Sequence, residues 1–290
     1  MLRSSGHHVT AIGRLKPTGA VSLADQDAWR RALTEVEAVM HLAGRAHVMN
    51  DVAASPLGEY RKINRDGTLC VAQAAVEAGV RRFVFVSSIG VLGNESGPRG
   101  FSEETPPAPV EPYAVSKYEA ELALKDLEHR TGLEIVVVRP PLVYGPHVKG
   151  NFHRLLRLVA NGVPLPLGSV RNRRSFIGVT NLSELLLLCA VRPLGAQRLF
   201  VACDGRDVST PELLSMMSSQ MNRPNRVFRF PTTTLRLLAR LAGADRELRR
   251  LTGNLHVDSA LASSVLQWAP SKSLETGIGE MVDWFVRSST

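Results

Sequence analysis

Short apolar strands alternate with long helices through the first two thirds of the chain, and this order constrains the fold more than any other feature. The sequence predicts strands over 9–12, 37–42, 82–86, 134–138 and 199–202, and helices over 26–33, 57–78, 113–130, 151–160 and 181–189. Residues 82–86, Arg-Phe-Val-Phe-Val, form a nearly continuous apolar run. Such strands between long helices indicate a parallel sheet that is covered on both faces. We therefore expect an α/β fold with a doubly wound parallel sheet.

The pattern loosens after Gly145 and Pro146. Loops rich in proline and arginine follow, together with helices predicted over 210–220, 233–241, 260–266 and 274–287. We expect residues 1–148 and about 176–204 to form the nucleotide-binding domain. Residues 149–175 and 205–290 would then form a smaller mixed lobe that binds the substrate.

The start of the sequence resembles the middle of a βαβ unit. Gly6 precedes the strand predicted over 9–12, as in the join between a first helix and a second strand. Nothing before Gly6 could supply the first strand and its glycine loop, so about 20 residues are expected to be missing. That strand is central in the order 3-2-1-4-5-6, so we expect the chain as written to bind a dinucleotide poorly. Met1 is then either a wrongly assigned start, which we favour, or the start of a truncated remnant.

Composition excludes several classes of protein. Hydrophobic residues make up 44% of the 290 residues and charged residues 21%, as in soluble globular proteins. The longest apolar run, Leu185–Val191, is far too short to cross a bilayer. Cys70, Cys189 and Cys203 are isolated, which argues against a disulfide framework and a metal site. No secretion signal is visible, and we expect a cytoplasmic protein without a membrane partner.

The net charge of +8 raises the question of nucleic-acid binding. The basic residues are spread along the chain, and the densest groups, at 171–174 and 246–250, have no interleaved aromatic residues. A solvated face or a site for a small polyanion explains these groups at least as well. We therefore expect no nucleic-acid partner.

The strongest chemical signal is the stretch Pro-Tyr-Ala-Val-Ser-Lys at 112–117. Residues four apart on a helix share a face, so the Tyr113 hydroxyl and the Lys117 ammonium can meet. A phenol has a pKa near ~10 and is a poor base at neutral pH. A neighbouring cation would lower that pKa into the working range for acid/base chemistry at a carbonyl or alcohol. The motif alone also arises by chance, as a tyrosine at a helix start and a surface lysine.

Position strengthens this interpretation. The strand over 82–86 ends at Ser87 and Ser88, and the helix that bears Tyr113 follows it after a proline-rich loop over 97–112. Ligands of open α/β sheets bind beyond the carboxyl ends of the strands. A serine there is often only a turn residue, but Ser88 could hold the reacting oxygen of a substrate beside the phenol.

Three longer stretches resemble a known family. FVFVSSIGVLG, PYAVSKYEAE and VVVRPPLVYGP, in this order and spacing, are similar to the extended short-chain dehydrogenases/reductases. Within that family the match is to the nucleotide-sugar epimerases and dehydratases typified by UDP-galactose 4-epimerase. HVMND, VKGNFHRLLRL and LGSVRNRRSFIGVTNL further resemble a bacterial branch with 4-keto-reductases of polysaccharide biosynthesis. The resemblance implies a Rossmann-type sheet and a UDP-sugar substrate.

The resemblance also implies roles for single residues. Ser88 would orient the sugar oxygen, Tyr113 would be the general acid/base, and Lys117 would also bind the nicotinamide ribose. Asn64 would help to place the catalytic helix. Further cofactor contacts would come from the strand ends, at Leu42, Ala43, Gly44, Val86 and Pro140. Contacts to the pyrophosphate of the substrate would come from Asn151, Arg174 and Arg250.

The strand predicted over 9–12 is followed by Gly13 and Arg14, which bears on the choice of cofactor. An acidic residue at this place would accept the adenosine ribose hydroxyl of NAD, whereas a cation suits the 2′-phosphate of NADP. Arg14 therefore favours NADP(H) over NAD(H), although a lone arginine could equally stack on adenine. NADP(H) in turn favours a reductase over an epimerase.

We therefore expect an enzyme that transfers a hydride at C4 of a UDP-hexose, as a 4-keto-reductase or a 4-epimerase. The alternative is a catalytically impaired or non-catalytic cofactor-sensing protein without the phosphate-binding loop. Relatives pair the helices that correspond to 57–78 and 113–130, so a homodimer through them is one expectation. The same apolar residues could instead face the sheet.

Overall fold

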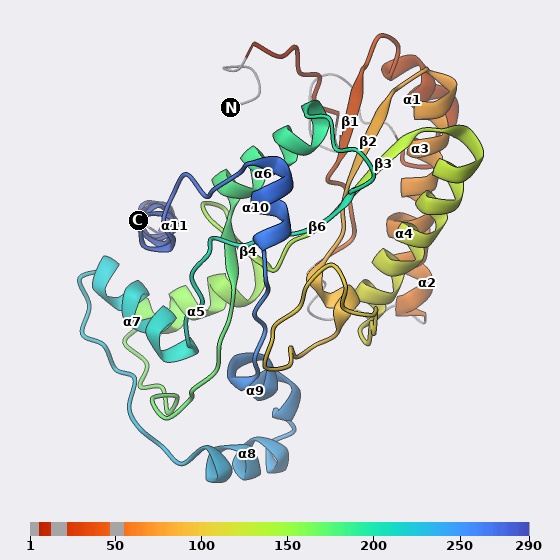
Figure 1. The fold of residues 1–290 in the computed structure, drawn as a ribbon. Coiled ribbons are helices and arrows are strands. Elements are labelled where there is room, and N and C mark those ends of the chain that lie inside the picture. The colour runs from red at the N-terminus through yellow and green to blue at the C-terminus, as the bar shows by residue number, and fades with distance from the viewer. Residues whose placement is uncertain (1–5, 13–21, 47–54, 290) are drawn as a thin grey trace.

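The computed structural model describes residues 6–12, 22–46 and 55–289, and Figure 1 shows their arrangement. Within these residues the main sheet has four parallel strands, in the spatial order β1 (Ala38–His41), β2 (Arg82–Val86), β3 (Glu134–Arg139) and β6 (Leu199–Val201). The register pairs His41 with Phe85 and Val86 with Val138. Because the strands are parallel, their carboxyl ends lie at one edge of the sheet.

Helices cover one face of the sheet along most of its length. These helices are α1 (Gln26–Ala32), α3 (Gly67–Glu77) and α4 (Pro112–Thr131). They enclose Phe83 and Phe85 of β2 in a cluster that also holds Trp29 and Leu124. Phe83, Phe85 and Leu124 are fully buried.

The opposite face is covered by α6 (Val179–Val191) and α10 (Ala260–Leu266). Here the sheet contributes Val84 of β2 with Val136 and Val138 of β3. Successive side chains of a strand point to opposite faces, so each strand needs apolar residues at nearly every position. The predicted doubly wound α/β sheet is confirmed.

The helix predicted over 57–78 is confirmed, but it contains an irregular turn. α2 (Pro56–Arg61) continues into the π-helical turn η2 (Lys62–Asp66), and α3 follows without a break. Such wide turns interrupt the regular spacing of a helix and are frequent at functional sites. This turn carries Asn64, whose side chain is fully buried.

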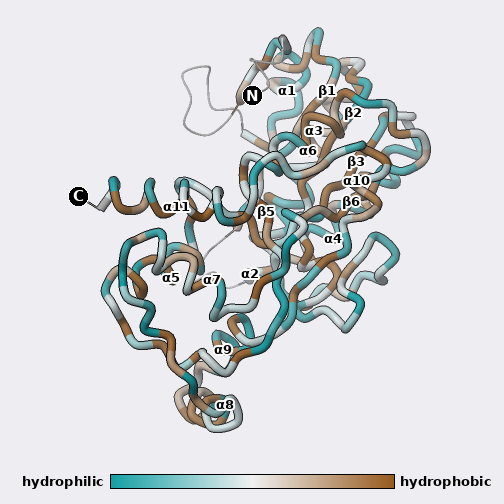
Figure 2. Tube along the Cα trace, turned by 60° about the vertical axis from the view of Figure 1, so that its left-hand side comes forward, coloured by the Kyte–Doolittle hydropathy of each residue, from teal (hydrophilic) through white to brown (hydrophobic). Residues whose placement is uncertain are grey.

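A second group of elements packs beside the sheet domain. It consists of α5 (Gly150–Ala160), α7 (Thr210–Gln220), α8 (Thr232–Leu241), α9 (Asp245–Thr252), α11 (Leu274–Ser289) and the parallel pair β4 (Leu142–Tyr144) and β5 (Phe176–Gly178). Its own apolar cluster includes Tyr144, Leu156, Leu214 and Ile278. Figure 2 shows apolar residues inside both groups. The cluster draws on both segments assigned to the substrate lobe. It also includes Tyr144 and Phe176, from segments assigned to the nucleotide-binding domain, and the division into domains stays a prediction.

The prediction of a strand over 9–12 is wrong. Residues 6–12 are irregular, and Thr10 and Ala11 are exposed, whereas an inner parallel strand would bury both faces. Only Ile12 packs against the cluster around Trp29. An apolar run this short does not by itself determine a strand.

Four short elements of the structure were not predicted from the sequence: β4, β5, α9 and the 3₁₀ turn η3 (Ile89–Leu92). The two strands have three residues each, and α9 buries only Leu248. Strands of three residues and a helix of eight are too short to show a periodic apolar pattern in the sequence. Within the described ranges, every helix is too short or too polar to cross a bilayer.

Candidate active site

The candidate site lies where β1, β2 and β3 end. Leu42, Ala43 and Gly44 follow β1 and are exposed, while Ser87 and Ser88 follow β2. Pairing continues past the ends of β2 and β3, since Ser87 N donates to Val138 O at 2.8 Å and Ile89 N donates to Pro140 O at 3.0 Å. These two bonds hold the backbone around Ser88 from both sides.

Ser88 is fixed by its own turn. Its side chain caps η3 by accepting a hydrogen bond from Gly90 N at 3.2 Å. The same hydroxyl lies near the phenol of Tyr113 and favours its ionised form. Ser88 therefore lies between the end of β2 and the first turn of α4.

Tyr113 starts the catalytic helix expected from the sequence. α4 begins at Pro112, whose ring suits the first turn of a helix, and Glu111 is its N-cap residue. The ring of Tyr60 lies edge-on to Tyr113, with 6.1 Å between ring centroids. Burial, with a smaller contribution from Tyr60, raises the pKa of Tyr113 to about 12, while the hydroxyl of Ser88 opposes this rise.

Lys117 lies one turn further along α4 and is buried. Its Nζ donates to Val86 O at 2.9 Å and lies 4.5 Å from the centroid of the Phe85 ring. Burial lowers the pKa of Lys117 to about 8, and the carboxylate of Glu121 opposes this shift. Ser88, Tyr113 and Lys117 thus meet around the end of β2, as the sequence predicts.

One detail of that prediction is wrong for this structure. Lys117 was expected to lower the pKa of Tyr113, yet the pKa of Tyr113 is raised. The reason is that burial disfavours the phenolate.

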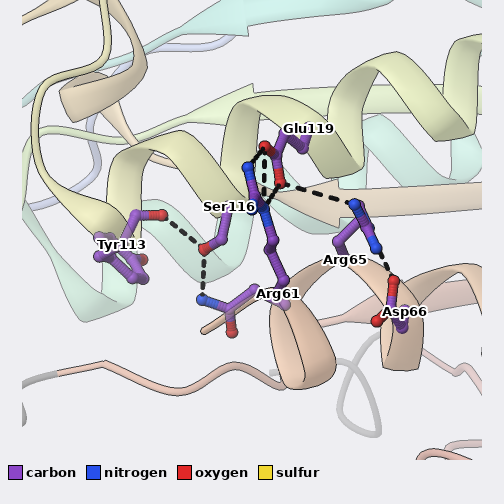
Figure 3. A network of polar contacts seen from close by, with 7 residues as sticks. Arg61, Arg65, Asp66, Tyr113, Ser116 and Glu119 are labelled. Atoms are coloured by element: carbon purple, nitrogen blue, oxygen red, sulfur yellow. Dashed lines mark hydrogen bonds and ion pairs between the residues drawn. The ribbon is translucent and has the colours of Figure 1, made fainter. Parts of the chain in front are cut away.

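Asn64 connects three elements around Lys117. Its Oδ1 accepts from Arg45 N at 2.7 Å, and its Nδ2 donates to Arg45 O at 3.2 Å and to Ser116 Oγ at 3.0 Å. Ser116 Oγ in turn donates to Tyr113 O at 2.7 Å, as Figure 3 shows. The side chain of Asn64 therefore links the loop after β1 to the helix that carries Tyr113.

A nicotinamide dinucleotide fits the residues at this edge. A Cβ on Gly44 would lie 3.2 Å from Asn64 Oδ1 and 3.4 Å from Lys117 Nζ, so a side chain here would crowd both groups. An ammonium has three donors, and the hydrogen bond to Val86 uses one. The remaining donors suit ribose hydroxyls. Arg14, the residue expected to select NADP(H), lies outside the described residues.

Two buried polar groups beneath the site were not predicted. His41, the last residue of β1, has Nε2 3.0 Å from Thr68 Oγ1. Because the Thr68 hydroxyl donates to Asn64 O at 2.7 Å, the histidine is the donor in this contact. Burial, aided by Lys117, lowers the pKa of His41 to about 3, so the ring stays neutral. The only sequence signal was a polar residue inside an apolar strand.

The second group is an ion pair between α4 and β3. Arg139 donates to both oxygens of Glu121, from Nε at 3.0 Å and from the terminal nitrogen at 2.5 Å. Ser87 Oγ also donates to Glu121, at 2.5 Å. Glu121 follows Lys117 by four residues, so helical spacing was the signal that could have found it.

The three residues expected at the pyrophosphate differ in their surroundings. Arg174 is buried and donates to Arg250 O at 2.7 Å and to Gly253 O at 3.2 Å, at the C-terminus of α9. Burial lowers the pKa of Arg174 to about 10. Arg250 is half-exposed and lies 3.3 Å from Glu111. Asn151, in the first turn of α5, is exposed, and none of the contacts found in the described residues joins it to these arginines.

Glu111 ties α9 to the start of α4. Its carboxylate accepts from Arg246 at both oxygens and from Arg250 at one. Since Glu111 precedes Tyr113 by two residues, the arginines of α9 are held close to the catalytic helix. Among the described residues, no group of three or more His, Cys, Asp or Glu side chains is placed so that it could hold a metal ion.

Comparison with known proteins agrees with this geometry. The sequence profile of the "NAD dependent epimerase/dehydratase family" matches residues 1–201, which is more than half of the chain. The chain belongs to this family. Its parallel sheet, with helices on both faces, is the Rossmann-type sheet that the resemblance to extended short-chain dehydrogenases/reductases implies.

Two of the relatives are named as sugar 4-epimerases. A Vibrio cholerae "UDP-glucose 4-epimerase" is 39% identical over 260 residues, covering 89% of this chain and 79% of that protein. An Escherichia coli O157:H7 "N-acetyl-alpha-D-glucosaminyl-diphospho-ditrans,octacis-undecaprenol 4-epimerase" is 28% identical, covering 69% of this chain and 59% of that protein. Among solved structures, MoeE5 in complex with UDP-glucose and NAD is 26% identical, with a TM-score of 0.75, covering 100% of this chain and 94% of the other.

Proposed function

We propose that this protein is an oxidoreductase that transfers a hydride at C4 of a UDP-hexose, with 4-epimerisation as its reaction. The observation that carries the proposal is the meeting of Ser88, Tyr113 and Lys117 at the carboxyl end of β2. The relationship to an epimerase of V. cholerae, at 39% identity, supports the choice of reaction.

Tyr113 would exchange a proton with the oxygen on C4. With its pKa raised to about 12, the phenol holds its proton and suits donation to a developing alkoxide. Removal of a proton from the C4 hydroxyl requires the pKa of Tyr113 to fall in the complex, and the nearby hydroxyl of Ser88 already acts in this direction. Ser88 would hold the sugar oxygen beside the phenol.

A bound nicotinamide supplies the acceptor and donor of the hydride. Lys117 would hold its ribose, with the ends of β1, β2 and β3 as the surrounding surface at Leu42, Ala43, Gly44, Val86 and Pro140. Arg14 favours NADP(H) over NAD(H), and parallel titrations of the protein with both cofactors, followed by nicotinamide fluorescence, test this choice.

The diphosphate of the substrate would bind Arg250, whose guanidinium is half-exposed and has one contact at 3.3 Å to Glu111. Arginine donors match phosphate oxygens well. Arg174 would act as a positioning residue, because both of its hydrogen bonds hold backbone carbonyls around α9. Asn151 is proposed as a further contact from α5.

Reduction of a UDP-4-keto-hexose is a second candidate, which Arg14 favours through NADP(H). Product analysis distinguishes the two reactions. An epimerase converts UDP-hexose to its 4-epimer without net use of cofactor, whereas a reductase consumes one NADPH for each 4-keto-sugar. A role in polysaccharide biosynthesis is supported by the E. coli relative, whose substrate carries an undecaprenol.

Substitution of Tyr113→Phe tests the mechanism. We expect turnover to fall by about 10²–10⁴, the usual contribution of a general acid/base. Thermal unfolding should change little, because the ring remains in place. Tyr118→Phe on the same helix is the matched control and should keep turnover. Equal turnover in Tyr113→Phe and the parent would refute the proposal and favour the non-catalytic alternative.

A further inference from the structure

α8 is the least buried helix among those that the structure describes. It spans Thr232–Leu241, and none of its residues is buried. Leu237, Leu238 and Leu241 are 58%, 51% and 78% exposed. Figure 1 places α8 far from the main sheet, and Figure 2 shows its apolar colouring at one extremity of the molecule.

The three exposed leucines share one face of α8. Leu237 and Leu241 are four residues apart, and Leu238 precedes Leu241 by three, which brings all three together on the helix surface. Leu235 and Ala239 are also four apart, and they pack against the apolar cluster of the substrate lobe. The helix thus has one face toward the lobe and an outer leucine face, formed by Leu237, Leu238 and Leu241, with exposed side chains.

Arginines flank this outer leucine face. Arg236 and Arg240 are exposed and four residues apart, between the two apolar faces. Residues 223–250 contain eight arginines and two acidic residues, which gives this segment +6 of the net +8 of the chain. The exposed leucines are therefore set in a strongly basic segment of the chain.

We propose that α8 docks the protein on an anionic lipid surface. The outer leucine face would enter the boundary between headgroups and acyl chains, and Arg236 and Arg240 would lie at the lipid phosphates, as in helices that lie in a membrane interface. A second copy is a poorer occupant, because twofold symmetry would bring two segments of charge +6 together. The proposal concerns peripheral binding and is independent of the reaction at Tyr113. It departs from the expectation, drawn from the sequence, that the protein has no membrane partner.

Vesicle binding tests the proposal directly. The probes are sucrose-loaded vesicles of phosphatidylcholine with 30% phosphatidylglycerol, and vesicles of phosphatidylcholine alone, with bound protein measured by sedimentation. We expect the protein to bind the anionic vesicles, with an affinity that falls as salt is raised. Leu237→Gln with Leu241→Gln should weaken this binding at least tenfold. Arg236→Gln with Arg240→Gln should remove most of the preference for anionic vesicles.

The control is a pair of exposed valines elsewhere, Val163→Gln with Val191→Gln, which should bind as the parent does. Circular dichroism and enzyme turnover should be unchanged in all variants, because none of these residues lies in the proposed site. Absence of binding by the parent, or equal binding by the leucine variant, would overturn the proposal. A lower molecular mass of the leucine variant in light scattering would do the same, since it would show that a second copy covers α8.

Discussion

The charge of Lys117 is disfavoured by its buried surroundings. Its ammonium is buried between Val86 O and the Phe85 ring, and its pKa is lowered from 10.5 to about 8. Burial of the charged form therefore opposes folding while the lysine is protonated. The same burial keeps unused donors next to Gly44, where a ribose would bind.

This shift predicts a pH dependence of stability. Between pH 8 and 10.5 the unfolded state keeps the proton on Lys117 and the folded state releases it, so stability rises with pH in this window. From pH 7 to 9.5 the free energy of unfolding of the parent should rise relative to Lys117→Met by about 2 kcal/mol. Urea unfolding at both pH values measures the difference.

Lys125→Met is the matched control, because Lys125 lies exposed on the same helix. Its difference from the parent should be the same at both pH values. The pH range stops at 9.5 because Tyr113, whose pKa is raised to about 12, has the opposite effect between pH 10 and 12. A pH-independent difference for Lys117→Met would contradict the assigned burial.

The sequence was sufficient to predict the candidate site residues Tyr113 and Lys117, but it did not predict the buried polar groups around them. Tyr113 and Lys117 were visible because helical spacing determines which side chains share a face. His41 and Glu121 were not, since their roles depend on what other elements place beside them: Thr68 from α3 and Arg139 from β3. Long-range partners of polar groups leave no periodic signal in a single sequence.

α4 is the element that organises the site. Its first turn carries Tyr113, its second Lys117, and its third Glu121, each one turn apart. Glu121 binds Arg139 of β3 and Ser87 after β2, so the helix is attached to both strands beneath the site. Both side chains of the ion pair are at most 8% exposed.

Removal of one member of this pair should be costly. Glu121→Leu leaves a buried guanidinium without its carboxylate, and we expect a loss of about 3–5 kcal/mol in unfolding free energy. Glu121→Leu with Arg139→Met removes both charges and should recover a large part of the loss. Chemical denaturation of the two single variants and the double variant measures the coupling.

The exposed pair of Asp126 and Arg130 on the same helix supplies the comparison. Asp126→Ala should cost less than about 1 kcal/mol, because water screens an exposed pair. Additive losses in the Glu121 and Arg139 variants would show that the two side chains do not stabilise each other.

The long elements were predictable and the short ones were not. The long helices over 57–78 and 113–130 were predicted, and the strand over 82–86 followed from its continuous apolar run. The π turn at Lys62–Asp66 left no such signal, although it places Asn64 against Arg45 and Ser116. Its geometry depends on a packing partner, α4, that the local sequence does not contain.

The whole molecule brings two distant parts of the chain to one site. α9 belongs to the second group of elements and α4 covers the main sheet, and Glu111 joins them through Arg246 and Arg250. The dense arginines at 246–250 suggested a polyanion site, but their proximity to Tyr113 depends on a contact across more than a hundred residues. The expected homodimer through the helices over 57–78 and 113–130 stays a prediction, for which light scattering is the test.

Glu111 should compete with the substrate for Arg250. Arg246 contacts both oxygens of Glu111, whereas Arg250 makes a single contact at 3.3 Å and is the more available for phosphate. We expect Glu111→Gln to lower KM for the UDP-hexose about fivefold, the equivalent of a surface ion pair of about 1 kcal/mol, with kcat nearly unchanged. Steady-state kinetics at low salt measure both constants.

Two further variants test the direction of this change in KM. Arg250→Gln should raise KM about tenfold or more, because charge-assisted bonds to the diphosphate are lost. Glu275→Gln, which breaks the exposed pair with Arg206 on another surface, should leave KM unchanged. If KM rises in Glu111→Gln as it does in Arg250→Gln, the carboxylate positions Arg250 and does not compete for it. In that case the contact between α9 and α4 assembles the diphosphate site, and the two halves of the molecule must be joined before substrate binds.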